Sequence, residues 1–337
     1  MSDVAKASAA GAGALVWSPR RLLEAAGPLL ALALLLIVGA SMSGSFLGAE
    51  NLSNVLTRSA LIGIIAIGAT FVITAGGLDL SVGSLSGLVA GLTIMFMNHG
   101  LPWLGGGWGL VAAGIACALF LGGCAGLLNG VMIVKGRVEA FIVTLGAMGI
   151  FRSILTWLSD GGSIALDFSL RTASRPIYYG EIAGISVPII VFALMAIVGE
   201  IVLRRTRFGR HVAAIGSSRP VAVYSAIPVD RVRILTYVVQ GLTVAAATAI
   251  YIPRLGTTTP STGLMWELEA IAAVIIGGTR LSGGFGRIWG TVAGVLILGF
   301  ISNILNLSGL VSPYLNGAFQ GAIIIIAVLL QRDRSQG

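Results

Sequence analysis

Long uninterrupted runs of apolar residues dominate this chain and limit the folds open to it. Of its 337 residues, 56% are hydrophobic and only 10% are charged, against about 25% charged in an ordinary soluble domain. A soluble protein of this length cannot cover so much apolar surface with so few charges. The runs also lack the short alternating segments of outer-membrane barrels. The sequence therefore predicts an all-α, polytopic membrane protein.

The apolar runs predict about ten transmembrane helices. They are expected at 28–47, 59–75, 80–98, 107–134, 139–158, 185–203, 232–252, 267–279, 288–306 and 314–331. The first run follows a basic pair and could imitate a signal peptide. Its length and the lack of an A-x-A cleavage site favour a retained helix. Together the runs define one transmembrane domain over 28–331, with tails at 1–27 and 332–337.

The basic residues predict how the chain is oriented. If the N-terminus lies in the cytoplasm and the helices alternate, most Lys and Arg residues fall in cytoplasmic connections. The exceptions are Arg58, Arg171, Arg175 and Arg254 outside, and Arg152 within a predicted helix. Cytoplasmic connections of membrane proteins carry an excess of Lys and Arg. Both termini are therefore predicted to be cytoplasmic, and the net charge of +8 indicates orientation rather than nucleic-acid binding.

Two long connections lie on opposite faces of this predicted topology. Residues 159–184 form the largest outer loop and residues 204–231 the largest cytoplasmic loop, so two different partners are expected. Within the cytoplasmic loop, Ser218 is placed to cap a short helix from Val221 to Ile227 that Pro228 would end. A short amphipathic helix that docks in a partner's groove is a common recognition mode. The alternative is an ordinary basic anchor loop.

The stretch GGLDLSVG, residues 76–83, places one carboxylate between two apolar runs. Its two glycines permit a sharp turn, and Asp79 is predicted to accept backbone N–H groups at the start of the next helix. The alternative is a direct role of Asp79 in gating or passage.

A related stretch, GGTRLSGG at 277–284, follows a second apolar run. The pair predicts duplicated broken-helix hairpins of the kind that transporters often contain, with chance similarity in a Gly-rich chain as the alternative. Arg280 takes the place of Asp79 in the second stretch, so these two residues are predicted to pair.

The sequence contains no motif for catalysis or nucleotide binding. It lacks the P-loop G-x-x-x-x-G-K-[ST], the H-E-x-x-H zinc motif and the G-x-S-x-G nucleophile motif. Its histidines have no ligand-spaced partners, and Cys117 and Cys124 lie about 10 Å apart along one predicted helix, too far to bridge. Catalysis, a cofactor and a metal site are therefore not expected. Carboxylates fall near helix ends or in turns, which disfavours proton-driven transport.

Uncharged polar and aromatic residues inside the predicted helices, with the residues of the first glycine turn, predict a polar conduit. The candidate path residues are Phe71, Thr74, Asp79, Ser81, Ser84, Asn129, Gln240 and Asn303. Asn54, Thr70, Thr144 and Asn316 are of the same kind. For any one of them, bonding between helices is the alternative. The turns are expected to matter most, because broken helices usually flank a translocation path.

Four ordered blocks resemble the inner-membrane permease subunits of ribose- and xylose-type carbohydrate ABC importers. They are TAGGLDLSVGSLSG at 74–87, GLLNGVMIVKGRVEAFIVTLGAMGIFR at 126–152, RRTRFGRHVAAIGSSRPVAVYSAIPVDRVRI at 204–234 and ELEAIAAVIIGGTRLSGGFGRIWGTVAG at 267–294. The resemblance implies a non-catalytic permease domain and a second permease copy, as a homodimer or a heterodimer with a paralogue. It also implies a separate pair of ATP-binding subunits and a periplasmic sugar-binding protein.

In such permeases the short helix of the cytoplasmic loop would be the coupling helix that docks on the ATPase. The corresponding residues here are Arg210, Gly216, Arg219, Val221, Ala222, Tyr224, Ala226 and Ile227. This stretch departs from the family pattern at its start, which is Pro-Val-Ala rather than acidic-Ala-Ala, and at Ala226, where glycine is usual. The expected function is import of a monosaccharide or related polyol into the cell across the bacterial inner membrane. The alternatives are a branched-chain amino acid permease with the same helix plan, and a secondary transporter or channel.

Overall fold

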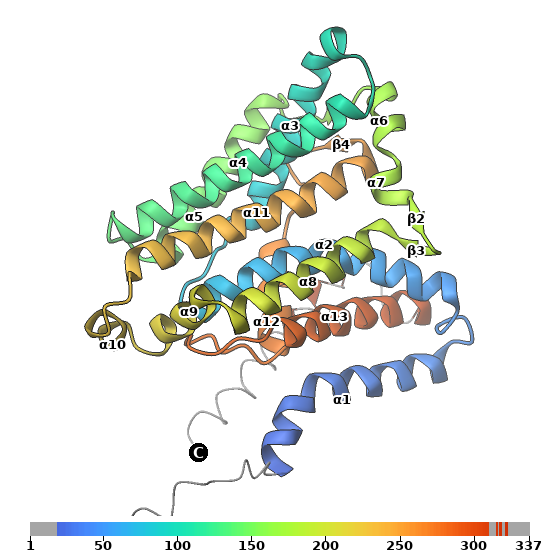
Figure 1. Cartoon of the computed structure of the whole chain (residues 1–337). Coiled ribbons are helices and arrows are strands. Elements are labelled where there is room, and N and C mark those ends of the chain that lie inside the picture. The colour runs from blue at the N-terminus through green and yellow to red at the C-terminus, as the bar shows by residue number, and fades with distance from the viewer. Residues whose placement is uncertain (1–18, 310–314, 316, 319–320, 323–337) are drawn as a thin grey trace, which may run out of the picture.

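The computed structural model describes residues 19–309, 315, 317–318 and 321–322, and helices make up most of this part of the chain (Figure 1). The longer helices are α1 (Pro19–Met42), α2 (Ala49–Thr74), α3 (Val82–Leu104), α4 (Trp108–Val134), α5 (Ala140–Leu158), α8 (Val187–Arg205), α11 (Val229–Leu255) and α13 (Ile288–Ser308). The shorter ones are α6 (Phe168–Ser174), α7 (Pro176–Tyr179), α9 (Arg207–Ser217), α10 (Arg219–Tyr224) and α12 (Trp266–Ile276). Strand β1 (Ile164–Ala165) pairs with β4 (Thr257–Thr258), and β2 (Glu181–Ile182) pairs with β3 (Ile185–Ser186), both antiparallel.

Helices occupy every predicted position up to residue 308, which confirms the all-α expectation. Most of the predicted helix 314–331, residues 1–18 and the C-terminal tail lie outside the described residues. Residues 19–27, predicted as part of the N-terminal tail, already belong to α1. Within the described part, seven helices are long and apolar enough to cross a membrane: α2, α3, α4, α5, α8, α11 and α13. Ten spans and cytoplasmic termini therefore stay predictions.

Helix α12 is too short to cross a bilayer, although 267–279 was predicted as one of the spans. It has 11 residues. At 1.5 Å per residue it is about 16 Å long, against a hydrocarbon core of about 30 Å. The helix ends at Ile276 with Gly277 as its C-cap, and the next residue, Gly278, has φ of 87° and turns the chain away. The two glycines therefore end this apolar helix at about half the length needed to cross the membrane.

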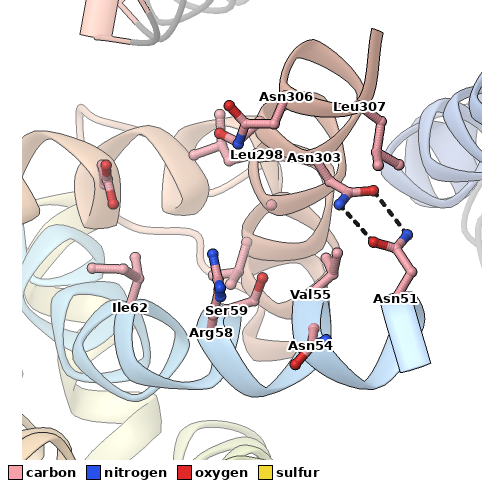
Figure 2. Close-up of a pocket in the computed structure, with 14 residues that line it drawn as sticks. Asn51, Asn54, Val55, Arg58, Ser59, Ile62, Leu298, Asn303, Asn306 and Leu307 are labelled. Carbon is pink, nitrogen blue, oxygen red and sulfur yellow. Dashed lines mark hydrogen bonds between the residues drawn. The ribbon is translucent and has the colours of Figure 1, made fainter. Parts of the chain in front are cut away.

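Helix α2 begins ten residues before its predicted start at residue 59. Its first turns contain Glu50, Asn51 and Asn54, whose polarity hides them from a reading based on apolar runs. These turns are nevertheless helical, and their asparagines line a cavity shared with α13 (Figure 2).

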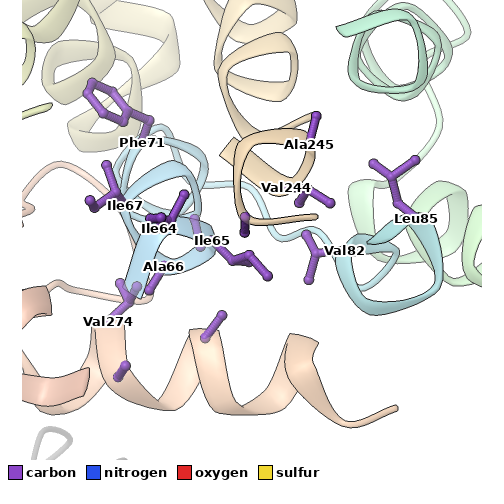
Figure 3. Packing of buried hydrophobic residues seen from close by; sticks show 14 of the residues in the cluster. Ile64, Ile65, Ala66, Ile67, Phe71, Val82, Leu85, Val244, Ala245 and Val274 are labelled. Carbon is purple, nitrogen blue, oxygen red and sulfur yellow. The ribbon is translucent and has the colours of Figure 1, made fainter. Parts of the chain in front are cut away.

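Helix α2 is the most buried of the candidate spans. Figure 3 shows Ile64 and Ile65 of α2 among side chains of α3, α11 and α12. By contrast, α4, α5 and α8 keep many large apolar side chains exposed, including Phe120 and Trp157. A helix with an apolar outer face can lie against lipid tails without exposing polar groups to them. The bundle therefore places α2 inside and these helices at its surface.

Glycines let α4 and α11 approach closely. Gly122, Gly126 and Gly130 recur every four residues along α4, and a Cβ atom on the first two would overlap backbone carbonyl oxygens of α11. The third would meet the α11 backbone at 3.0 Å. Small residues at this spacing are a common means of packing helices in membranes, where water does not drive association.

The two glycine stretches singled out in the sequence lie against each other. Gly76, with φ of 78°, turns the chain after α2, and the amide of Gly284, which follows α12, donates a 2.9 Å hydrogen bond to the carbonyl oxygen of Thr74. Both turns therefore meet at the end of the bundle that carries α9 and α10. The predicted pairing of Asp79 with Arg280 is wrong. Asp79 is bonded to Ser81, whereas the Arg280 guanidinium lies 5.7 Å from the centre of the Phe285 ring.

Candidate functional site

A polar cavity lies between the first turns of α2 and the second half of α13 (Figure 2). It encloses about 390 Å³. Its lining residues are Asn51, Asn54, Val55, Arg58, Ser59 and Ile62 from α2, Glu269 from α12, and Val295, Leu298, Gly299, Ser302, Asn303, Asn306 and Leu307 from α13. A volume of this size matches the lower range of small-molecule sites, about 300–1,000 Å³.

Two asparagines join the walls of this cavity. Nδ2 of Asn51 donates to Oδ1 of Asn303 at 3.0 Å, and Nδ2 of Asn303 donates to Oδ1 of Asn51 at 2.9 Å. Both side chains are half-buried. Each amide is a donor and an acceptor, so the pair can exchange its mutual bonds for bonds to a hydroxylated ligand. The cavity therefore offers uncharged hydrogen-bonding groups beside apolar side chains, together with one basic residue, Arg58, and one acidic residue, Glu269.

Helical spacing brings the polar lining residues together. Asn51, Asn54 and Arg58 are three and four residues apart on α2, and Asn303 and Asn306 are three apart on α13, so each set shares one helix face. Asn54 and Asn303 were predicted from the sequence as polar helix residues, whereas the other polar lining residues were not. The N-x-x-N-x-x-x-R spacing at 51–58 was the available signal.

A second polar group closes the first glycine turn. Oδ1 of Asp79 accepts hydrogen bonds from the amide of Ser81 at 2.9 Å and from its hydroxyl at 2.6 Å. Nδ2 of Asn129, on α4, donates to the Ser81 hydroxyl oxygen at 3.0 Å, and the Ser84 hydroxyl donates to the Ser81 carbonyl. These four side chains are at most 7% exposed. The predicted role of Asp79 as an acceptor of backbone N–H groups at the start of α3 is confirmed for one group, the amide of the N-cap residue Ser81.

The other predicted path residues are also buried between helices. The Thr74 hydroxyl donates to Thr70 of its own helix, Phe71 stacks on Phe208 with ring centres 6.0 Å apart, and Nε2 of Gln240 donates to the carbonyl of Ile65 at 3.3 Å. Of the eight candidates, the structure places Asn303 in the polar cavity and the other seven in the packed interior. Contact with a substrate stays a prediction for all of them.

Helix α10 presents an apolar surface at one end of the bundle (Figure 1). Val221 is 61%, Val223 57% and Tyr224 91% exposed, whereas Ala222 is buried against the bundle. Ser218 precedes this helix as predicted, but α10 ends at Tyr224 rather than Ile227. The reason is Ala226, whose φ of 55° lies in the left-handed region and cannot continue a helix.

The remaining predicted coupling residues surround this helix. Arg210 and Arg219 are exposed, Ile227 packs on the core beneath, and Gly216 lies two residues before the N-cap of α10. An ion pair between Lys135 and Asp230, 3.1 Å between Nζ and Oδ2, ties the start of α11 to the end of α4 nearby. The eight residues therefore gather at the α9–α10 end, although nothing in their geometry alone identifies a partner.

At the opposite end, the connection 159–184 folds into α6, α7 and short strands (Figure 1). A hollow of about 350 Å³ there is lined by Phe168, Arg171, Thr172, Arg175, Tyr179 and Pro253. Asp167 caps α6, with its carboxylate accepting the Ser169 amide at 2.8 Å and hydroxyl at 2.6 Å. These bonds hold the pKa of Asp167 below its ordinary value. In the described part of the chain, no three His, Cys, Asp or Glu residues are grouped to hold a metal ion.

Several known proteins are similar to this chain over most of its length. Residues 51–328 match the family described as "Branched-chain amino acid transport system / permease component". The ribose import permease protein RbsC of Bacillus subtilis is 39% identical over 318 residues, covering 92% of this chain and 93% of its own length. The D-allose transport system permease protein AlsC of Escherichia coli is 33% identical and covers 91% of both chains. The xylose transport system permease protein XylH of Haemophilus influenzae is 32% identical, covering 87% of this chain and 92% of its own.

These matches confirm the resemblance seen in the four sequence blocks. They span nearly the whole of both partners in each comparison, and the relatives are all membrane permeases. With seven candidate spans among the described residues, the chain is a multi-pass protein of the inner membrane. It belongs to the permease family of binding-protein-dependent import systems, in the branch that holds the ribose, xylose and allose permeases.

Proposed function

We propose that this chain is the permease subunit of an ABC importer and forms the path for a monosaccharide or related polyol. The observation that carries the proposal is the polar cavity between α2 and α13, with its paired amides Asn51 and Asn303. The full-length likeness to ribose, xylose and allose permeases supports a sugar over a branched-chain amino acid.

The chemistry of the cavity suits a neutral, hydroxylated solute. Sugar hydroxyl groups donate and accept hydrogen bonds, and amide side chains do both without a net charge. When a sugar enters the cavity, Asn51 and Asn303 exchange their mutual hydrogen bonds for hydrogen bonds to sugar hydroxyl groups. The sugar and the two amides therefore lose few hydrogen bonds during passage. Val55 and Leu298 supply apolar surface for the C–H faces of the sugar ring.

Replacing the amide pair tests this role. The double variant Asn51→Ala and Asn303→Ala removes both bonds from a half-buried position. Sugar uptake by the assembled importer is expected to fall about 5- to 150-fold, the loss from two hydrogen bonds of 0.5–1.5 kcal/mol each. Thr156→Ala, on the exposed surface of α5, is the matched control. Uptake at the wild-type rate in the double variant, with its thermal stability unchanged, removes the cavity from the path.

We infer that α9 and α10 face the cytoplasm and that α10 docks on a dimer of ATP-binding subunits. Arginines concentrate at this end in 204–233, which accords with the positive-inside rule. Exposed Val221, Val223 and Tyr224 form the kind of aromatic and aliphatic knob that fills a groove on a partner. Residues 204–231 are then the coupling loop, and both termini of the permease domain 28–331 lie on the cytoplasmic side.

A binding measurement tests the docking surface. Tyr224→Ala removes a side chain that is 91% exposed and makes no core contact, so the permease should fold normally. A central aromatic anchor contributes at least about 2 kcal/mol, so affinity for the ATP-binding subunit should fall about 30-fold. The control is Phe120→Ala on α4, which is 70% exposed at a distant face. Equal affinity of both variants rules out α10 as the docking helix.

The opposite end is proposed to receive the sugar-loaded binding protein. The hollow lined by Phe168, Arg171, Arg175 and Tyr179 combines cationic and aromatic side chains, with Arg175 5.4 Å from the centre of the Tyr179 ring. Such a surface favours a partner with acidic side chains. Two permease copies, identical or paralogous, complete the proposed membrane assembly.

A further inference from the structure

Three backbone segments from distant parts of the sequence meet at one point near the α9–α10 end. They are the last turn of α9 at Gly216, the turn after α2 at Gly76, and the turn after α12 at Gly283 and Gly284. The connection between the two turns is the 2.9 Å hydrogen bond from the Gly284 amide to the Thr74 carbonyl oxygen.

Gly216 lies directly against that hydrogen bond. A Cβ atom at this position would overlap both the Thr74 carbonyl oxygen and the Gly284 amide nitrogen. From the other side, a Cβ on Gly283 would lie 3.0 Å from the Cα atoms of both Gly216 and Gly76. Because these neighbours are backbone atoms, they cannot move aside as a flexible side chain can. The contact therefore requires glycine at each of these positions.

The left-handed backbone at the turns adds to this requirement. Gly76 has φ of 78°, Gly283 of 85° and Gly284 of 81°, values that residues with a Cβ atom rarely adopt. Gly216 is different, because it lies in the regular helix α9. Its lack of a side chain is explained by the approach of the two turns alone.

The position of Gly216 links this contact to the exposed helix α10. Ser218, two residues further on, is the N-cap of α10, and its carbonyl accepts the amide of Ala222 at 3.0 Å. Only Ser217 and Ser218 therefore separate Gly216 from the first residue of α10. With so short a connection, a displacement of α10 is expected to move Gly216 against both turns.

We propose that Gly216 is a positioning residue that passes movement of the α10 surface to both broken helices at once, through the Thr74–Gly284 hydrogen bond. This inference rests on the proposed docking of ATP-binding subunits on α10. It adds that the two turns respond together, so that the broken ends of α2 and α12 shift as one body during each ATP cycle.

The variant Gly216→Ala tests this in the complete importer, reconstituted with its ATP-binding subunits and binding protein. Assembly and ATP hydrolysis are expected to persist, whereas ATP-driven uptake should fall by about 5- to 150-fold, the usual size of coupling between two sites. Hydrolysis should also lose its stimulation by sugar-loaded binding protein. The control is Gly149→Ala on α5, where an added Cβ meets nothing within 4 Å. Wild-type uptake and stimulation in Gly216→Ala overturn the inference.

Hydrogen–deuterium exchange on the wild-type importer covers the case in which the variant does not fold. We expect ATP-analogue trapping to change protection in 207–224, 75–81 and 277–287 together. A change in 207–224 that leaves either turn unaffected overturns the inference. A wild-type chain that neither binds an ATP-binding subunit nor takes up sugar with ATP instead refutes the proposed function, which separates the two failures.

Discussion

Replacement of Asp79 separates a structural role from a role in passage. In the native turn, one carboxylate oxygen holds both the amide and the hydroxyl of Ser81, and Ser81 is fully buried. Asp79→Ala leaves both donors without this acceptor. An orphaned buried donor costs about 1–3 kcal/mol, so the two donors together cost about 2–6 kcal/mol of stability, and relief from burying the Asp79 charge offsets part of this loss.

Asp79→Asn is the matched control for this prediction. Its side-chain carbonyl oxygen can still accept from Ser81, so only the charge assistance to two hydrogen bonds is lost. Relief from burying a charge offsets part of that loss, and the net change should stay within about 1 kcal/mol. The assay is thermal and denaturant unfolding of the purified chain in detergent, together with uptake by the reconstituted importer.

The two variants should therefore differ strongly in stability, with uptake following the amount of folded protein. If Asp79→Asn is as stable as the wild type but fails to transport, the carboxylate acts in passage or gating and the capping account is refuted. If Asp79→Ala is as stable as the wild type, the hydrogen bonds to Ser81 contribute nothing, and the reasoning from buried donors fails.

Two further results are expected. Gly126→Ala should lower the free energy of unfolding in detergent by about 1–3 kcal/mol, because the added Cβ overlaps the Tyr237 carbonyl. The control Gly149→Ala should leave it unchanged. Equal stability of the two variants contradicts the close packing of α4 on α11. Because the pKa of Asp167 is lowered in the folded state, its bonds to Ser169 stabilise the start of α6 above the unfolded pKa and are lost as pH falls through the lowered value. Exchange protection in 168–174 should fall with acid in the wild type and be pH-independent in Asp167→Asn; the same acid response in both argues against the cap.

The sequence predicted those features that depend on local patterns. Apolar runs located the helices up to residue 308, and a carboxylate before a helix predicted the role of Asp79. The first turns of α2 were not predicted, because their residues are too polar to stand out as part of an apolar run. Those turns nevertheless supply Asn51 and Arg58 to the cavity.

Features that depend on contacts between distant segments could not be predicted in the same way. The pairing of Asp79 with Arg280 failed because aligned positions in similar stretches need not face each other, and Arg280 lies over Phe285 instead. The meeting of Gly216 with both turns joins segments far apart along the chain. Nothing in the local sequence of α9 distinguishes this glycine from one that merely fills a helix.

Uptake by proteoliposomes tests the central claim most directly. The chain is reconstituted alone, and also with its ATP-binding subunits, and labelled ribose, xylose and allose are supplied with or without the binding protein. We expect accumulation of one of these sugars or a related polyol only when the ATP-binding subunits, ATP on their side and the binding protein are all present. Movement of sugar down its gradient through the chain alone, independent of ATP, would contradict the account and make the protein a channel or secondary transporter.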